Sequence, residues 1–172
     1  MALSGMIMII LLASCVDEKN QRKSPTVSNK DLQESLLDAN RKAVKTEDQQ
    51  IKDFIDRYNW DLTETGSGLR YKIYETGKGA KASEGKIAVI NFEVSLLNGE
   101  VLYTSNASGP KEFMIGRGGV VSGLEEGILF LHEGDRAKFI IPSHLAYGLA
   151  GDQNKITGKA TLVYDVELLK LK

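Results

Sequence analysis

After Trp60 the sequence predicts an α+β domain, in which one face of an antiparallel sheet is covered by a single helix. Three observations predict this fold. Apolar residues alternate with polar ones in several separate stretches, as in half-buried strands. The pair Asn98-Gly99 favours a tight hairpin turn between two of these stretches. Only residues 122–131 have the apolar spacing of a helix in this part of the chain.

The first fifteen residues differ from the rest. Residues 1–14 carry no charged side chain, and an apolar run extends from Met6 to Ala13. The run is shorter than the roughly 20 apolar residues that cross a bilayer, and it is typical of a secretory signal peptide. Cys15 is the single cysteine of the chain, and Leu12-Ala13-Ser14-Cys15 resembles the bacterial lipobox, in which the cysteine is acylated and becomes the mature N-terminus.

These features predict a lipoprotein signal peptide over residues 1–14 and a lipid anchor, of the palmitate type, at Cys15. The expected location is the cell envelope, with the protein held at a membrane and facing the periplasm or the cell surface. The alternative is an ordinary signal peptide followed by a buried free thiol. A single cysteine excludes a structural disulfide within the chain.

Residues 15–45 are mostly polar and predict a flexible tether. A helix is predicted over residues 46–60, because Thr46 and Gln49 have the spacing of a capping box and apolar residues follow at helical intervals. These apolar residues are Ile51, Phe54, Ile55 and Tyr58. One apolar stripe on a short helix favours docking onto its own domain, and dimerisation through the stripe is the alternative.

The predicted strands follow from period-two alternation. The longest has an apolar face from Ala88 to Leu96, and the last has one from Leu162 to Leu168. The full set of predicted strands covers residues 69–73, 88–96, 101–103, 112–115, 137–141 and 162–168. Between them, Ser122 and Glu125 have capping-box spacing and open the helix that carries Leu124, Ile128 and Leu131 on one face.

Charge and histidine content narrow the function classes. The chain has 22 Lys and Arg against 23 Asp and Glu, so no global charge favours nucleic acid. His132 and His144 lack neighbours with metal-ligand spacing, and no phosphate-binding glycine motif follows a predicted strand. We therefore expect no metal, no cofactor and no nucleic-acid partner.

Three blocks of sequence resemble the FKBP-type peptidyl-prolyl cis-trans isomerases. They are residues 120–127 (VVSGLEEG), 141–148 (IPSHLAYG) and 160–169 (ATLVYDVELL), preceded by 68–71 (GLRY), so the resemblance covers residues 66–172. With the N-terminal features, the chain resembles envelope FKBP lipoproteins and, more distantly, the gliding-motility-associated lipoprotein isomerases. The resemblance implies an antiparallel sheet of five or six strands curled around one short helix, with an apolar pocket between them.

The resemblance also implies the site residues. Tyr147 would donate a hydrogen bond to a substrate carbonyl, and Phe92 and Tyr164 would complete the catalytic set. The remaining substrate-binding residues would be Val120, Val121, Leu124, Ile156, Leu102 and Tyr103. Considered without the resemblance, most of these are ordinary core residues, whereas Tyr147 lies in a loop where a bulky ring is more typical of function.

The chain departs from the family pattern in several places. Leu102-Tyr103 stands where an aromatic residue and an aspartate are usual, Leu124 where tryptophan is usual, and Lys111 where an aromatic residue is usual. Ile156-Thr157-Gly158 replaces the usual Ile-Pro-Pro. Loss of these aromatic walls predicts weaker macrolide binding and lower catalytic efficiency than in typical members.

Two functions follow as hypotheses. The first is an isomerase that assists the folding of proline-containing polypeptides in the cell envelope. The second is a catalytically weak domain that serves as a chaperone or as a structural part of an envelope or motility machine. Retained Phe92, Tyr147 and Tyr164 favour the first, and the changed Leu102, Tyr103 and Leu124 favour the second.

Overall fold

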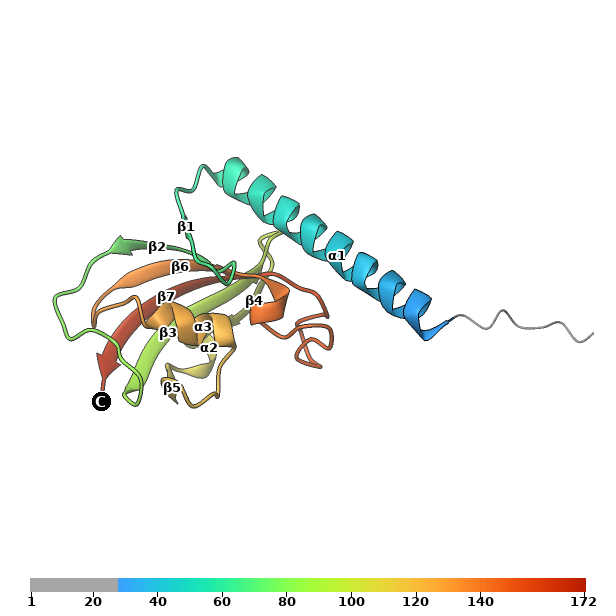
Figure 1. The fold of residues 1–172 in the computed structure, drawn as a ribbon. Helices are drawn as coiled ribbons and strands as arrows, with labels where there is room; N and C mark the ends of the chain where they lie inside the picture. Colours follow the sequence, from blue (N-terminus) through green and yellow to red (C-terminus); the bar gives the residue numbers. More distant parts are fainter. Residues whose placement is uncertain (1–27) are drawn as a thin grey trace, which may run out of the picture. The chain divides into compact units, whose positions relative to one another are not determined.

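The computed structural model of the chain describes residues 28–172 (Figure 1). The predicted signal peptide, Cys15 and the beginning of the predicted tether lie outside the described residues. The chain divides after Asp38, and the compact unit of residues 39–172 contains the sheet. The elements in order are α1 (Asn29–Tyr58), β1 (Thr63–Glu64), β2 (Arg70–Glu75), β3 (Ile87–Leu96), β4 (Val101–Thr104), α2 (Ser105–Ser108), β5 (Lys111–Met114), α3 (Ser122–Ile128), β6 (Arg136–Ile141), the 3₁₀ helix η1 (Ser143–Leu145) and β7 (Leu162–Leu171).

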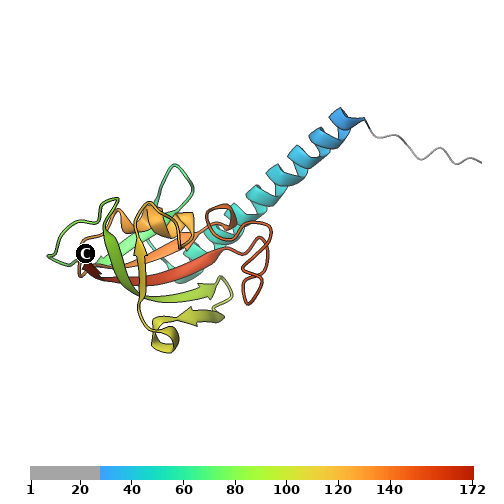
Figure 2. The ribbon, with the colours of Figure 1, turned by 90° about the horizontal axis from the view of Figure 1, so that it is seen from below.

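The predicted α+β fold with an antiparallel sheet is confirmed. The strands follow the order β1-β2-β6-β7-β3-β4, and β5 also pairs with β3. The sheet has seven strands rather than five or six, because the two-residue β1 adds to the six predicted strands; β4 and β5 both pair with the same edge of β3. Figure 2 shows the resulting curl of the sheet.

Strands β4 and β5 pair with the same edge of β3 and leave a gap between them at Phe92. Residues Ile87 to Ile90 pair with β5, and Glu93 to Ser95 pair with β4. At the gap between these pairings, the Phe92 backbone N–H donates to Ser105 Oγ at 3.1 Å, at the start of α2. At Phe92 a side-chain oxygen thus takes the place of the backbone acceptor that a neighbouring strand would supply, and the Phe92 amide remains hydrogen-bonded.

Helix α3 covers one face of the sheet, as predicted. Leu124 and Ile128 are 2% and 0% exposed and share a core with Phe139 of β6. A Cβ atom added at Gly127 would lie 2.6 Å from Phe139 Cε1, so glycine allows the helix to approach the sheet closely.

The capping box predicted at the start of α3 is wrong. Val121 is the N-cap and Ser122 is already helical, with its hydroxyl donating to the Leu145 carbonyl at 3.1 Å. Glu125 instead accepts a hydrogen bond from the Gly118 amide at 2.8 Å, which fixes the loop before the helix. The Ser-x-x-Glu spacing is therefore used for tertiary contacts on both sides of the helix.

The predicted start of the N-terminal helix at residue 46 is also wrong, since α1 begins at Asn29 and occupies much of the predicted tether. No Gly or Pro occurs between Pro25 and Gly66, so nothing interrupts the helix. Thr46 lies inside it and donates to the Lys42 carbonyl at 2.9 Å, a common use of threonine within helices. Within residues 28–172, no helix combines the length and apolar character needed to cross a bilayer.

The C-terminal half of α1 docks on the sheet face opposite to α3. Ile51 and Phe54 are buried in a second core with Ile140 and Val163, whereas the alternating neighbour Phe139 belongs to the α3 core. This burial favours the predicted docking over dimerisation through these two residues.

Two partly buried polar contacts accompany the docking of α1. The Glu47 carboxylate accepts hydrogen bonds from the Ser143 amide and the Thr161 hydroxyl, each at 2.6 Å. Arg70, only 4% exposed, pairs with Asp48 at 2.5 Å. Glu47 thereby ties the helix to the loop that follows β6, the same loop that carries Tyr147.

Candidate active site

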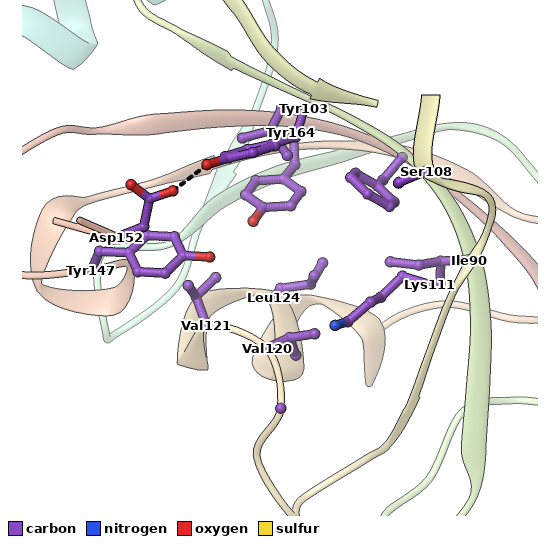
Figure 3. Close-up of a pocket in the computed structure, with 13 residues that line it drawn as sticks. Ile90, Tyr103, Ser108, Lys111, Val120, Val121, Leu124, Tyr147, Asp152 and Tyr164 are labelled. Atoms are coloured by element: carbon purple, nitrogen blue, oxygen red, sulfur yellow. Dashed lines mark hydrogen bonds between the residues drawn. The ribbon is translucent and has the colours of Figure 1, made fainter. Parts of the chain in front are cut away.

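A pocket of about 260 Å³ lies between α3 and the sheet (Figure 3). Its apolar walls come mainly from β3, from β7 and from the segment that leads into α3. Ile90, Phe92 and Val94 alternate along β3, and Tyr164 of the neighbouring β7 pairs with Val94. Val120, Val121 and Leu124 close the opposite side from the start of α3.

Strand alternation explains why these residues meet. Residues two apart on β3 point to the same face, and the register places Tyr164 beside them on β7. Tyr164 is 6% exposed, and burial raises the pKa of its hydroxyl. The hydroxyl therefore remains protonated at neutral pH, so this wall of the pocket carries no charge.

Tyr147 is at the mouth of the pocket, in the loop after η1, with its hydroxyl pointing inward (Figure 3). Burial raises the pKa of Tyr147, and the nearby Asp152 carboxylate adds to the effect. Among residues 28–172, no hydrogen-bond partner is found for this hydroxyl. A protonated and unpartnered O–H beside an apolar cavity can donate to a carbonyl that enters it.

Tyr103 and Asp152 connect the loop that carries Tyr147 to the sheet. The Tyr103 hydroxyl donates to Asp152 Oδ2 across the rim of the pocket (Figure 3). This hydrogen bond lowers the pKa of the Asp152 carboxyl and raises that of Tyr103. Asp152 Oδ1 accepts from the amides of Asn154 and Ile156, at 2.9 and 2.7 Å. Both carboxylate oxygens are therefore already engaged.

Most residues predicted for the site line this one pocket. They are Phe92, Tyr103, Val120, Val121, Leu124, Tyr147 and Tyr164. Leu102 and Ile156 do not line it; they are 6% and 3% exposed and pack in the core. Leu102 precedes Tyr103 on β4, and strand alternation turns the two side chains to opposite sides.

Ile156 contributes through its backbone, which donates to Asp152. Asp152 and Lys111 also line the pocket; the sequence pattern does not predict Asp152, and Lys111 stands out in it only as a departure from the family. Spacing alone gives no signal for Asp152, since its partner Tyr103 lies 49 residues away in the sequence. Among the described residues, no group of three or more His, Cys, Asp or Glu side chains could hold a metal ion.

Comparison with known proteins gives the family. Residues 78–169 match the sequence profile described as FKBP-type peptidyl-prolyl cis-trans isomerase. The chain belongs to this family. A probable FKBP-type isomerase of Haemophilus influenzae is 30% identical over 160 residues, which cover 89% of this chain and 64% of the relative. The probable isomerase FkpA of Neisseria meningitidis is 42% identical over 108 residues, covering 62% of this chain and 39% of the relative.

Solved structures agree with the FKBP-type fold. The crystal structure of FkpA from Escherichia coli matches with a TM-score of 0.64 and 28% identity, over 86% of this chain and 74% of that one. The crystal structure of AtFKBP13 matches with a TM-score of 0.63 and 29% identity, over 66% of this chain and all of that one. The FKBP-type region of this chain corresponds to about two fifths of the length of the FkpA relatives.

Three residues that depart from the FKBP pattern line the pocket. Leu124 forms its floor, Lys111 of β5 extends over that floor, and Tyr103 donates a hydrogen bond to Asp152 at the rim. An ionised aspartate at position 103 has no donor and a shorter side chain, so it could not replace the hydrogen bond from Tyr103 to Asp152. Tyr103 and Asp152 therefore act as a matched pair that holds the loop of Tyr147.

Proposed function

We propose that this chain is a peptidyl-prolyl cis-trans isomerase that acts on proline-containing polypeptides and assists protein folding in the cell envelope. The observation that carries the proposal is the apolar pocket with the unpartnered Tyr147 hydroxyl at its mouth. Membership of the FKBP-type family supports it.

The pocket suits the chemistry of the reaction. Rotation about an X-Pro bond breaks amide resonance over a barrier of about 18–20 kcal/mol, without making or breaking a covalent bond. An apolar site favours the twisted amide, because its charge separation is smaller than that of the planar amide. A thousandfold acceleration needs only about 4 kcal/mol of preferential binding to the transition state.

Each wall has a role in this scheme. Phe92, Val121 and Tyr164 surround the prolyl ring and exclude water from the rotating bond. Tyr147 donates to a carbonyl of the bound peptide and holds one side of that bond while the other rotates. The hydrogen bond from the Tyr103 hydroxyl to the Asp152 carboxylate keeps the Tyr147 loop in place.

Replacement of Tyr147 by phenylalanine is expected to lower kcat/KM several-fold, because one neutral hydrogen bond contributes on the order of 1 kcal/mol. The measurement is the isomerisation rate of a proline-containing peptide at a series of concentrations of the purified chain. Tyr74→Phe is the matched control, since this half-exposed tyrosine donates to Asp165 outside the pocket. Equal losses in the two variants would contradict the role of Tyr147.

A second function is favoured by the altered walls of the pocket. Leu124 supplies a smaller floor than tryptophan, and Lys111 places an ammonium where an aromatic ring is usual. A pocket of this kind suits a weak catalyst that works as a chaperone or as a structural part of an envelope or motility machine. Suppression of client aggregation by a folded chain that does not accelerate isomerisation would favour this function.

The proposed location rests on the sequence of the first fifteen residues. Cys15→Ala is expected to move the protein from the membrane to the soluble fraction, because acylation of that thiol provides the anchor. Cell fractionation, with mass analysis of the mature N-terminus, measures both the position and the acyl chains. A wild-type chain that is soluble, unacylated and cleaved elsewhere would contradict the anchor.

A further inference from the structure

Two charged residues are found among the described residues that line the pocket, Lys111 and Asp152. Their surroundings differ. Asp152 accepts three hydrogen bonds, from the Tyr103 hydroxyl and from the amides of Asn154 and Ile156. Its negative charge is therefore already partly stabilised, and each oxygen accepts at least one hydrogen bond.

Lys111 has no such compensation. Within residues 28–172, no carboxylate lies within ion-pair distance of its ammonium, and no carbonyl or hydroxyl accepts from it. Its backbone is fixed by pairing with Ile90 in the ladder between β5 and β3. Figure 3 shows the side chain extended over the pocket, with the ammonium toward Val120 and Leu124.

We propose that Lys111 makes the site select polypeptides with an acidic residue next to the proline. This inference rests on the proposed isomerase function and names the substrate class of the same pocket. A prolyl ring between Phe92 and Leu124 brings its neighbouring residues to the mouth, where the ammonium is the unpaired charge. A carboxylate there gains an ion pair partly screened from water by the apolar walls.

The expected effect is modest and specific. An ion pair at a partly exposed site changes kcat/KM by about two- to fivefold. The preference should decline in 1 M salt, where charges more than about 3 Å apart are screened. A lysine next to the proline should be disfavoured, because Lys111 repels a second ammonium. The Asp152 carboxylate, which could attract that ammonium, already accepts a hydrogen bond from Tyr103.

The test compares matched peptides on the full chain. Exchange NMR gives kcat/KM for Ala-Glu-Pro-Phe, Ala-Gln-Pro-Phe and Ala-Lys-Pro-Phe, and for a second set with the same residues after the proline. Each ratio to the glutamine peptide is then compared between wild type and variants, so that the intrinsic differences between peptides cancel. The variants are Lys111→Met, Lys111→Arg and Lys111→Glu, and Lys170→Met is a control on an exposed strand lysine outside the pocket.

We expect the glutamate peptide to be favoured in at least one set by wild type, Lys111→Arg and Lys170→Met. Lys111→Met should lose the preference, and Lys111→Glu should invert it toward the lysine peptide. Acceleration of all peptides with ratios that Lys111 variants do not change would overturn this inference and leave the isomerase function standing. A wild-type preference for lysine would also overturn it, and would point to Asp152. No acceleration of any peptide by the folded chain would overturn both proposals.

Discussion

Replacement of Phe92 by alanine is expected to lower kcat/KM for X-Pro isomerisation by about 10- to 100-fold. The ring forms a wall of the pocket at the gap between two pairings of β3, and its loss removes apolar contact worth about 1.5–3 kcal/mol. The ring is only partly buried, so its loss should cost less stability than that of a fully buried phenylalanine. The measurement is kcat/KM at a temperature where the variant is folded by circular dichroism.

Phe113→Ala is the matched control for this prediction. Phe113 is 6% exposed on β5 and packs in the same core, but it does not line the pocket. We expect a loss of about 3–5 kcal/mol in the free energy of unfolding and little change in kcat/KM per folded molecule. If both variants lost catalysis equally, the pocket would not be the site of the reaction.

The second large effect concerns stability. Phe54→Ala is expected to lower the free energy of unfolding by about 3–4 kcal/mol, because the ring is 6% exposed beneath α1 and meets Trp60 edge to face at 5.2 Å. Urea unfolding of the chain measures the loss. The folded remainder should keep its kcat/KM, since Phe54 packs on the sheet face opposite to the pocket.

Val44→Ala on the same helix is the control for Phe54→Ala. Val44 is 58% exposed, so its truncation should change stability by no more than about 0.5 kcal/mol. A similar small change in Phe54→Ala would show that the C-terminal half of α1 is not held on the sheet by this core.

The sheet could be predicted from local patterns because each strand carries its own signal. Alternation from Ala88 to Leu96 corresponds to β3, and the Asn98-Gly99 turn joins it to β4. The start of α1 could not be predicted in this way. Its first turns are mostly polar and their leucines, Leu32, Leu36 and Leu37, are about half exposed. Thr46, which has the spacing of a capping box, lies inside the helix and donates to the Lys42 carbonyl.

The site was predicted less completely than the fold. Period-two alternation and the family resemblance place Phe92 and Tyr164 in one pocket, and the structure brings them together with Tyr147. Asp152 could not be predicted, because its role depends on a hydrogen bond to Tyr103 between a loop and a distant strand. In the sequence, Tyr103 stands where the family usually has an aspartate, which indicates that a rim carboxylate is missing. In the structure, Tyr103 donates a hydrogen bond to Asp152, which supplies a carboxylate at the rim.

The proposed isomerase activity is best tested by the rate of cis-trans interconversion of a neutral peptide such as Ala-Gln-Pro-Phe. With the purified, folded chain present, we expect this rate to rise in proportion to protein concentration, and Phe92→Ala to remove most of the increase. A rate equal to that of the uncatalysed peptide, which interconverts over tens of seconds or more, would contradict isomerase activity in this pocket.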